Sequence, residues 1–181
     1  MRVVEISSFG GPQGLALAER DKPTCGPGQV LVKVIAAGVN GPDIAQRKGL
    51  YPPPPGASDL PGLEISGEVV EVGEGVSRWK TGDLVCALTK GGGYAEFVAV
   101  EAAHCLPIPP GVDVVDAAGL CETYFTVWSN CFFHQADQKP GRFLIHGGSG
   151  GIGSTAIMLR LLGWTVIATC GDDGKSNYSR L

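Results

Sequence analysis

The sequence predicts a mixed α/β protein, with an antiparallel β-barrel or sandwich over roughly the first 120 residues and one βαβ unit near the end. Three observations support this. Short apolar runs bounded by glycines fill the first part, helical spacing begins after residue 112, and a strand, a glycine turn, a helix and a strand follow between 143 and 170. Glycine supplies 28 of 181 residues without any repetitive tract. We therefore assign the glycines to turns and close backbone approaches, and not to disorder.

Four runs of the first part predict strands, because they are short, apolar or β-branched, and bounded by turn residues. They are VLVKVIAAGV (30–39), ISGEVVEVG (65–73), LVCAL (84–88) and YAEFVAV (94–100). Strands of this length and spacing are typical of an antiparallel barrel or sandwich. The stretch YPPPPGASDLPG (51–62) cannot be a helix or a central strand, because proline lacks the backbone donor. We expect an extended surface loop there.

The second part predicts a helix over 121–135 and then a βαβ unit. One face of that helix carries Tyr124, Val127, Trp128, Cys131 and Phe132. The strands are FLIHGG (143–148) and TVIATC (165–170), and the helix between them ends at Gly163 as its C-terminal cap. Ile152, Ala156 and Leu159 fall in helical register on it. The two strands should be parallel, with a right-handed crossover.

The turn GSGGIG (148–153) matches G-x-G-x-x-G between a predicted strand and a predicted helix, a context typical of dinucleotide binding. Gly148 and Gly150 would allow a tight turn close to a pyrophosphate, and Gly153 would let the helix pack on the strand. Amides of the turn, including Ser149, Gly151 and Ile152, would face the phosphates. The alternative is a structural glycine turn that binds nothing.

The end of the second strand favours NADPH over NADH. NAD enzymes place an acidic residue there, whereas this strand ends in Thr169-Cys170-Gly171. Lys175 can pair with a ribose 2′-phosphate, unless it is an ordinary solvated lysine. If Asp172 or Asp173 bends back toward the ribose, the preference reverses.

Composition excludes several other functions. The net charge is −4 and the basic residues are scattered, which argues against a nucleic-acid surface. No stretch approaches the roughly 18 apolar residues of a membrane span, and the N-terminus has no leader pattern. The six cysteines (25, 86, 105, 121, 131 and 170) lack metal-ligand spacing. We expect buried free thiols in a cytoplasmic protein.

Taken together, these motifs resemble the zinc-independent quinone oxidoreductase family of the medium-chain dehydrogenase/reductase superfamily, and within it the p53-inducible type. The segments that carry the resemblance are AAGVNGPDIAQRKGLYPPPPGAS (36–58), PGLEISGEVVEVG (61–73), WKTGDLVCAL (79–88), GGGYAEFV (91–98), AAGLCETYFTVWSN (117–130) and LIHGGSGGIGSTAI (144–157). It implies a GroES-like β-barrel over 1–120, followed over 121–181 by a linker helix and the first βαβ unit of an incomplete Rossmann domain.

The resemblance also implies that no zinc is bound. Zinc-dependent relatives carry G-H-E where this chain has Gly62-Leu63-Glu64, and a cysteine near the position of Asn40. Leucine and asparagine do not replace those ligands. Glu64 is structural in this interpretation.

The implied activity is hydride transfer from NADPH to quinones or similar electron-poor acceptors. Asn40 would bond the nicotinamide ribose or the substrate oxygen, Tyr51 would donate a proton or hydrogen bond to that oxygen, and Thr126 would hold the carboxamide. Each can also be an ordinary packing, turn or helix residue. Two alternatives stay open: an enoyl-thioester reductase on the same scaffold, and a truncated, non-catalytic family member. Cys121 stands where the family usually has proline, and Asp172 where it has a small residue.

We expect the chain to be a fragment that is inactive alone. A Rossmann domain needs two βαβαβ halves, and the sequence after Phe143 supplies one βαβ unit and the start of a further helix. The segment that returns to the first domain in the family is also missing. Apolar surface should be exposed around 143–145 and 166–168. We expect the full-length protein to be a homodimer.

Overall fold

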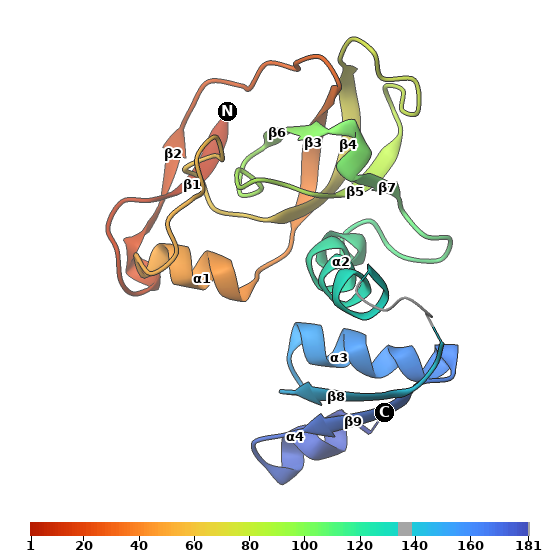
Figure 1. Cartoon of the computed structure of the whole chain (residues 1–181). Coiled ribbons are helices and arrows are strands. Elements are labelled where there is room, and N and C mark those ends of the chain that lie inside the picture. Colours follow the sequence, from red (N-terminus) through yellow and green to blue (C-terminus); the bar gives the residue numbers. More distant parts are fainter. Residues whose placement is uncertain (134–138, 181) are drawn as a thin grey trace. The chain divides into compact units, whose positions relative to one another are not determined.

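The computed structural model describes residues 1–133 and 139–180 (Figure 1). The chain divides into two compact units, Met1–Glu122 and Thr123–Leu181. Each unit is described below by itself.

The Met1–Glu122 unit is built on antiparallel strands. A five-stranded sheet has the order β6-β3-β4-β5-β7, and β1 and β2 form a separate pair. The strands are β1 (Arg2–Ile6), β2 (Leu15–Glu19), β3 (Gln29–Ala37), β4 (Glu64–Val72), β5 (Leu84–Leu88), β6 (Phe97–Glu101) and β7 (Cys105–Pro107). The helical segments are α1 (Gly41–Arg47) and the 3-10 turns η1 (Pro12–Gly14), η2 (Ala102–His104) and η3 (Asp116–Gly119).

The four predicted strands correspond to β3, β4, β5 and β6. The predicted start of the last one is wrong, because β6 begins at Phe97 and not at Tyr94. The residues before it serve β1 instead: Val4 N donates to Tyr94 O at 2.8 Å, and Ala95 forms a bridge with Val3. Strands β1, β2 and β7 and helix α1 were not predicted.

Alternating apolar residues of the four central strands build the core of this unit. Val30 and Val32 of β3 are fully buried beside Ile65, Val69, Val85, Ala87, Val98 and Val100. The predicted loop at 51–62 contains no helix or strand. It is not entirely a surface loop, however, since Leu60 and Pro61 are buried. The carbonyl oxygens of these two residues accept from Gly92 N and Tyr94 N, which holds the end of the loop inside.

The Thr123–Leu181 unit contains the predicted βαβ unit. Its elements are α2 (Cys121–Trp128, which begins in the preceding unit), a π-helical turn η4 (Ser129–Phe133), β8 (Arg142–His146), α3 (Gly151–Ile157), a 3-10 turn η5 (Met158–Leu162), β9 (Thr165–Thr169) and α4 (Asp173–Tyr178). Strands β8 and β9 pair in parallel, which confirms that prediction. Gly163 ends the helical segment with φ of +85°, as expected of a C-terminal cap.

The predicted helix over 121–135 is only partly right. The α-helix ends at Trp128 and a π-helical turn continues to Phe133, whereas 134 and 135 lie outside the described residues. Its buried face carries Val127 and Cys131, which pack with Ala156, Leu159 and Trp164. Tyr124 and Trp128 were expected on that face but are 40% and 54% exposed. Ile152 of α3 is likewise at the rim, at 36%.

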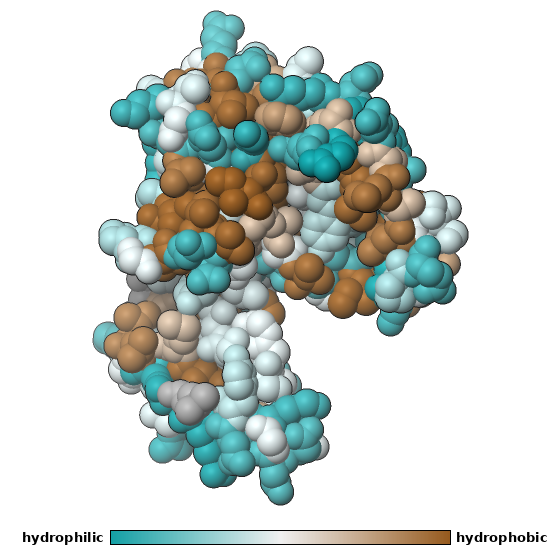
Figure 2. All heavy atoms as spheres, turned by 180° about the vertical axis from the view of Figure 1, so that it is seen from behind, coloured by the Kyte–Doolittle hydropathy of each residue, from teal (hydrophilic) through white to brown (hydrophobic). Residues whose placement is uncertain are grey.

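Apolar surface remains exposed on both units. Figure 2 shows apolar side chains gathered on one outer face of the larger unit, and its exposed large apolar residues include Leu17, Ile35 and Val39. In the smaller unit Leu144 and Ile167 are 57% and 53% exposed. They lie in the two strands where we expected exposed apolar surface. Within the described ranges, no helix is long and apolar enough to cross a bilayer.

Candidate cofactor and acceptor sites

The glycine turn is bonded to itself and to the end of β9. Gly147 N and Gly148 N donate to Thr169 O at 3.1 and 2.9 Å, and Gly150 N donates to Gly147 O at 2.9 Å. These amides are therefore occupied. The first amide bonded within α3 is Ser154 N, to Gly150 O at 2.8 Å. The N–H groups at the front of the helix, where a phosphate would bind, thus belong to 151–153.

The turn has no room for side chains at two of its glycines. A Cβ at Gly148 would lie 2.8 Å from Ala168 Cβ and 3.0 Å from Ser179 Oγ. A Cβ at Gly153 would lie 2.7 Å from Gly148 Cα. Gly153 was expected to let α3 approach the strand. The atoms closest to it belong instead to the glycine turn, at Gly147 and Gly148. The bare backbone forms a cradle of the kind that a pyrophosphate needs.

Asp172 and Lys175, the polar groups considered for the ribose, lie at the start of α4, just after β9. Asp172 caps α4, because its Oδ1 accepts from Lys175 N at 2.9 Å. Its Oδ2 lies 3.2 Å from Lys175 Nζ. These bonds to Lys175 lower the pKa of Asp172. The Lys175 ammonium is therefore neither free nor simply solvated, and a 2′-phosphate would share it with Asp172.

Helix α2 approaches the glycine turn. A Cβ at Gly151 would lie 3.1 Å from Thr123 Cγ2, and Thr126 follows Thr123 by about one helical turn. The Thr126 carbonyl accepts from Ser129 Oγ at 3.1 Å and Asn130 Nδ2 at 2.8 Å. His146, the last residue of β8, lies beside the end of β9, with its Nδ1 3.0 Å from the hydroxyl of Thr169.

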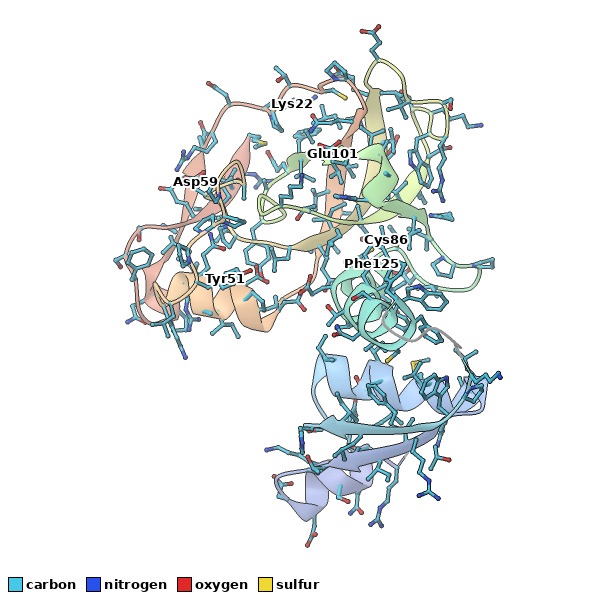
Figure 3. The ribbon with its side chains drawn as sticks, in the orientation of Figure 1. Lys22, Tyr51, Asp59, Cys86, Glu101 and Phe125 are labelled. Atoms are coloured by element: carbon cyan, nitrogen blue, oxygen red, sulfur yellow. The ribbon has the colours of Figure 1, made fainter. Side chains whose placement is uncertain are left out.

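Tyr51 lines a cavity of about 270 Å³ in the Met1–Glu122 unit. The phenol is 48% exposed and follows α1 in the chain, and Figure 3 shows it beside that helix. Prolines 42, 53 and 54, Leu63 and Leu88 supply apolar walls. The polar side chains include Gln46, Thr89, Lys90 and Glu122. An apolar cavity with a few polar groups suits a small carbonyl compound.

Asn40 lies in a buried network of carboxylates. Its Nδ2 donates to Glu64 Oε1 at 2.8 Å, and its backbone N donates to Asp43 Oδ2 at 2.9 Å. The other oxygen of Glu64 accepts from Glu122 N at 2.8 Å. Gly62 N and the Tyr94 hydroxyl donate to Asp43 at 2.9 and 3.3 Å. Asn40 and the cavity of Tyr51 are thus linked through Glu64 and Glu122.

The surroundings raise the pKa of two of these groups. Partial burial and the carboxylates of Glu64 and Asp43 raise the pKa of Glu122. Burial and the Asp43 carboxylate raise the pKa of Tyr94. Sequence reasoning missed Asp43, Tyr94 and Glu122 as members of the site. The signals were an acidic residue three positions after Asn40 and another at the start of a helix.

The six cysteines are free, and Cys86, Cys105, Cys121 and Cys131 are buried. Cys25 and Cys170 are only partly covered, so the expectation of buried thiols holds for four of the six. Cys121 hydrogen-bonds Cys86, which lowers the pKa of Cys86, whereas burial raises the pKa of Cys105 to about 12. Within the part of the chain that the structure describes, no three His, Cys, Asp or Glu side chains are grouped to hold a metal ion.

Residues 26–110 match the family model of the alcohol dehydrogenase GroES-like domain. Among characterised proteins, quinone oxidoreductase of Rattus norvegicus is 38% identical over 97% of this chain and 54% of its own length. The synaptic vesicle membrane protein VAT-1 homolog of Homo sapiens is 35% identical over 88% of this chain and 41% of its own length. The chain spans about half the length of the curated relatives it matches.

Solved structures agree over 99% of the chain. A quinone oxidoreductase of Pseudomonas syringae pv. Tomato DC3000 superimposes with a TM-score of 0.85 at 32% identity, and the match covers 55% of that chain. The CurK enoyl reductase gives 0.86 at 27% identity and 56% coverage. Mycobacterial Rv1454c, solved in complex with NADPH, gives 0.85 at 29% identity and 56% coverage.

Proposed function

Because the chain belongs to the quinone oxidoreductases of the medium-chain dehydrogenase/reductase superfamily, we propose that it serves NADPH-dependent hydride transfer to quinones or similar electron-poor acceptors. The observation that carries the proposal is the glycine cradle between parallel strands and α3, where side chains are excluded at Gly148 and Gly153. The relative solved with NADPH supports the choice of cofactor.

The cofactor would lie along the smaller unit. The amides at 151–153 and the turn from Gly148 to Gly153 would hold the pyrophosphate, with Ser149 beside it. Gly171 and Lys175 would border the ribose 2′-phosphate, and Thr126 would hold the carboxamide. When bound, NADPH supplies the hydride, and the chain supplies orientation and a proton.

The acceptor would enter the cavity of Tyr51. The phenol would donate a hydrogen bond to the acceptor oxygen, and Asn40 would hold the ribose or the substrate. In the full-length protein, we expect Tyr51→Phe to lower turnover with little change in NADPH affinity, and Asn40→Ala to weaken both. Enzyme kinetics with separate NADPH titrations measure the two effects. Wild-type rates in Tyr51→Phe would leave Tyr51 as a packing residue.

An enoyl-thioester reductase is the second candidate, because the CurK enoyl reductase matches the fold as well as the quinone oxidoreductase does. Rates with a quinone and with a crotonyl thioester separate the two.

The proposal further includes independence from zinc, since Leu63 and Asn40 offer no metal ligand of the required kind. It also includes a cytoplasmic location and a homodimer for the full-length protein. Non-catalytic binding of the cofactor remains the alternative if neither acceptor is reduced.

The first test is cofactor binding by the chain itself. NADPH and NADH are titrated against the fluorescence of buried Trp164, which packs in the same unit as α3. We expect saturable binding with NADPH tighter. Lys175→Met should remove the preference, and Asp172→Ser should strengthen NADPH binding because it frees the lysine. Tighter binding of NADH, or binding of neither, would contradict the proposal.

A further inference from the structure

Reduction of a quinone needs a proton as well as a hydride. The hydride brings two electrons and one hydrogen, and the quinone must gain a second hydrogen, as a proton on an oxygen, before the hydroquinone is neutral. A general acid for this step works best when its pKa lies near the working pH. The following inference rests on the proposed function and asks which group of this chain supplies that proton.

We propose that Glu122 is the proton donor to the acceptor oxygen in the cavity that it lines with Tyr51. Position supports this first: Glu122, the second residue of α2, lines this cavity, and its backbone N donates to Glu64 Oε2 at 2.8 Å. This hydrogen bond fixes the position of the Glu122 backbone, from which the side chain extends. A carboxylic acid can lose its proton to the oxygen and regain one from solvent through the open cavity.

The electrostatic surroundings favour the protonated form of Glu122. The acidic groups that act on Glu122 are Glu64 on β4 and Asp43 on α1, whose side chains are buried, with exposures of 2% and 4%. Their carboxylates already accept hydrogen bonds from Asn40 and from backbone N–H groups. Partial burial, together with these two carboxylates, raises the pKa of Glu122. Lys90 lines the same cavity but is exposed, and Tyr51, in the loop over 51–62, also lines the cavity.

The roles of Glu122 and Tyr51 then differ. Glu122 transfers the proton, so removing its carboxyl group should slow the chemical step. Tyr51 donates a hydrogen bond that orients the acceptor oxygen. Glu122→Gln keeps the size and an N–H donor but cannot transfer a proton. Glu74→Gln is the matched control, because this substitution makes the same chemical change at an exposed position of the same unit.

The test uses the full chain and duroquinone, whose fully substituted ring resists addition by the free thiols. Carboxyl carbon NMR of glutamate-labelled protein follows Glu122, assigned by loss of its signal in Glu122→Gln. We expect the titration midpoint of the Glu122 carboxyl to lie above that of the Glu74 carboxyl, and to rise further when duroquinone binds. Duroquinone binding should be full below this midpoint and weaken above it, because only the acid form donates. Glu122→Gln should bind without this pH dependence, and Glu74→Gln should behave as wild type.

Turnover gives the second readout. Where NADPH-dependent reduction is measurable, Glu122→Gln should lower it by about 100-fold or more, and Tyr51→Phe by less. A Glu122 midpoint equal to that of Glu74, or an unchanged pH dependence in Glu122→Gln, overturns the donor role while the reductase function stands. Failure of duroquinone to bind at all, with Glu122 still titrating high, overturns the proposed function and the donor role with it.

Discussion

Single buried polar groups of the barrel differ in how well they are satisfied. Thr89 Oγ1 donates to Gly62 O at 2.8 Å, and Gln46 Nε2 donates to Asp59 O at 3.0 Å. Ser66 Oγ on β4 is fully buried and has no hydrogen-bond partner among the described residues. An unsatisfied buried hydroxyl costs free energy of folding, whereas a bonded one is close to neutral or favourable.

The contrast predicts opposite effects for two small substitutions. Ser66→Ala removes an unpaired hydroxyl and should leave the free energy of unfolding unchanged or raise it by up to about 1 kcal/mol. Thr89→Val keeps the shape but removes one of the two hydrogen bonds to Gly62 O, which still accepts from Gly93 N at 3.0 Å, and should lower the free energy of unfolding by about 0.5–1.5 kcal/mol. Urea unfolding followed at Trp79, in the same unit, measures both. Equal losses in the two variants would show that Ser66 has a partner after all.

Residues that sequence predicted well are those whose requirement is local. Gly163 as a cap and the glycines at 148 and 153 follow from backbone conformation and spacing over a few positions. The bond from Asn40 to Glu64 joins positions 24 apart, and no local pattern encodes it. The same is true of Glu122, whose backbone N reaches Glu64 across 58 positions. The sequence therefore predicted the glycine turn but not the buried carboxylates near Asn40, and binding of a cofactor at the turn stays a prediction.

Elements divide in a similar way. Strands β3, β4 and β5 are rich in apolar and β-branched residues and were predicted close to their bounds. Strand β2 has the sequence LALAE, in which alanine and leucine carry little strand preference, and its partner β1 begins at residue 2. Helix α1 is only seven residues long and begins with glycine and proline. Its stability comes from tertiary bonds to Asp43, which propensity does not report.

At the level of the βαβ unit, Gly153→Ala tests the cradle. Alanine in a helix is favoured over glycine by about 1 kcal/mol, so a gain would follow if there were space. Here the new Cβ would lie 2.7 Å from Gly148 Cα, which is backbone and cannot turn aside. We expect a net loss of about 1–3 kcal/mol in the smaller unit and loss of NADPH binding.

Gly141→Ala is the matched control for this substitution. Its Cβ would meet only Trp164, at 3.9 Å, which is an ordinary contact. Thermal unfolding and NADPH titration of the two variants compare stability and binding on the same unit. Should Gly153→Ala bind NADPH as well as Gly141→Ala does, the close approach at 153 would not be required by the cofactor.

The whole chain consists of two units with cores of very different size. The larger has the apolar interior of a five-stranded sheet, whereas the smaller buries Val127, Cys131, Ala156, Leu159 and Trp164. The smaller unit also exposes Phe133, Leu161, Leu144 and Ile167, each by more than half. A domain of about 60 residues buries a low fraction of its surface and is marginally stable. Each unit has its own core, so the two need not unfold together.

We therefore expect two unfolding transitions, with the smaller unit unfolding at the lower urea concentration. Tryptophan reports each separately. The variant Trp128→Phe/Trp164→Phe leaves Trp79, which is buried in the larger unit with Nε1 bonded to Ala102 O at 2.9 Å. Trp79→Phe leaves the two tryptophans of the smaller unit. NADPH should move the lower transition to higher urea by more than the upper one, because a ligand stabilises the unit that binds it by mass action and most of the proposed cofactor contacts belong to the smaller unit. A single transition that coincides for both reporters, or one in which NADPH shifts the Trp79 signal alone, would contradict this assignment of stability and cofactor binding to the units.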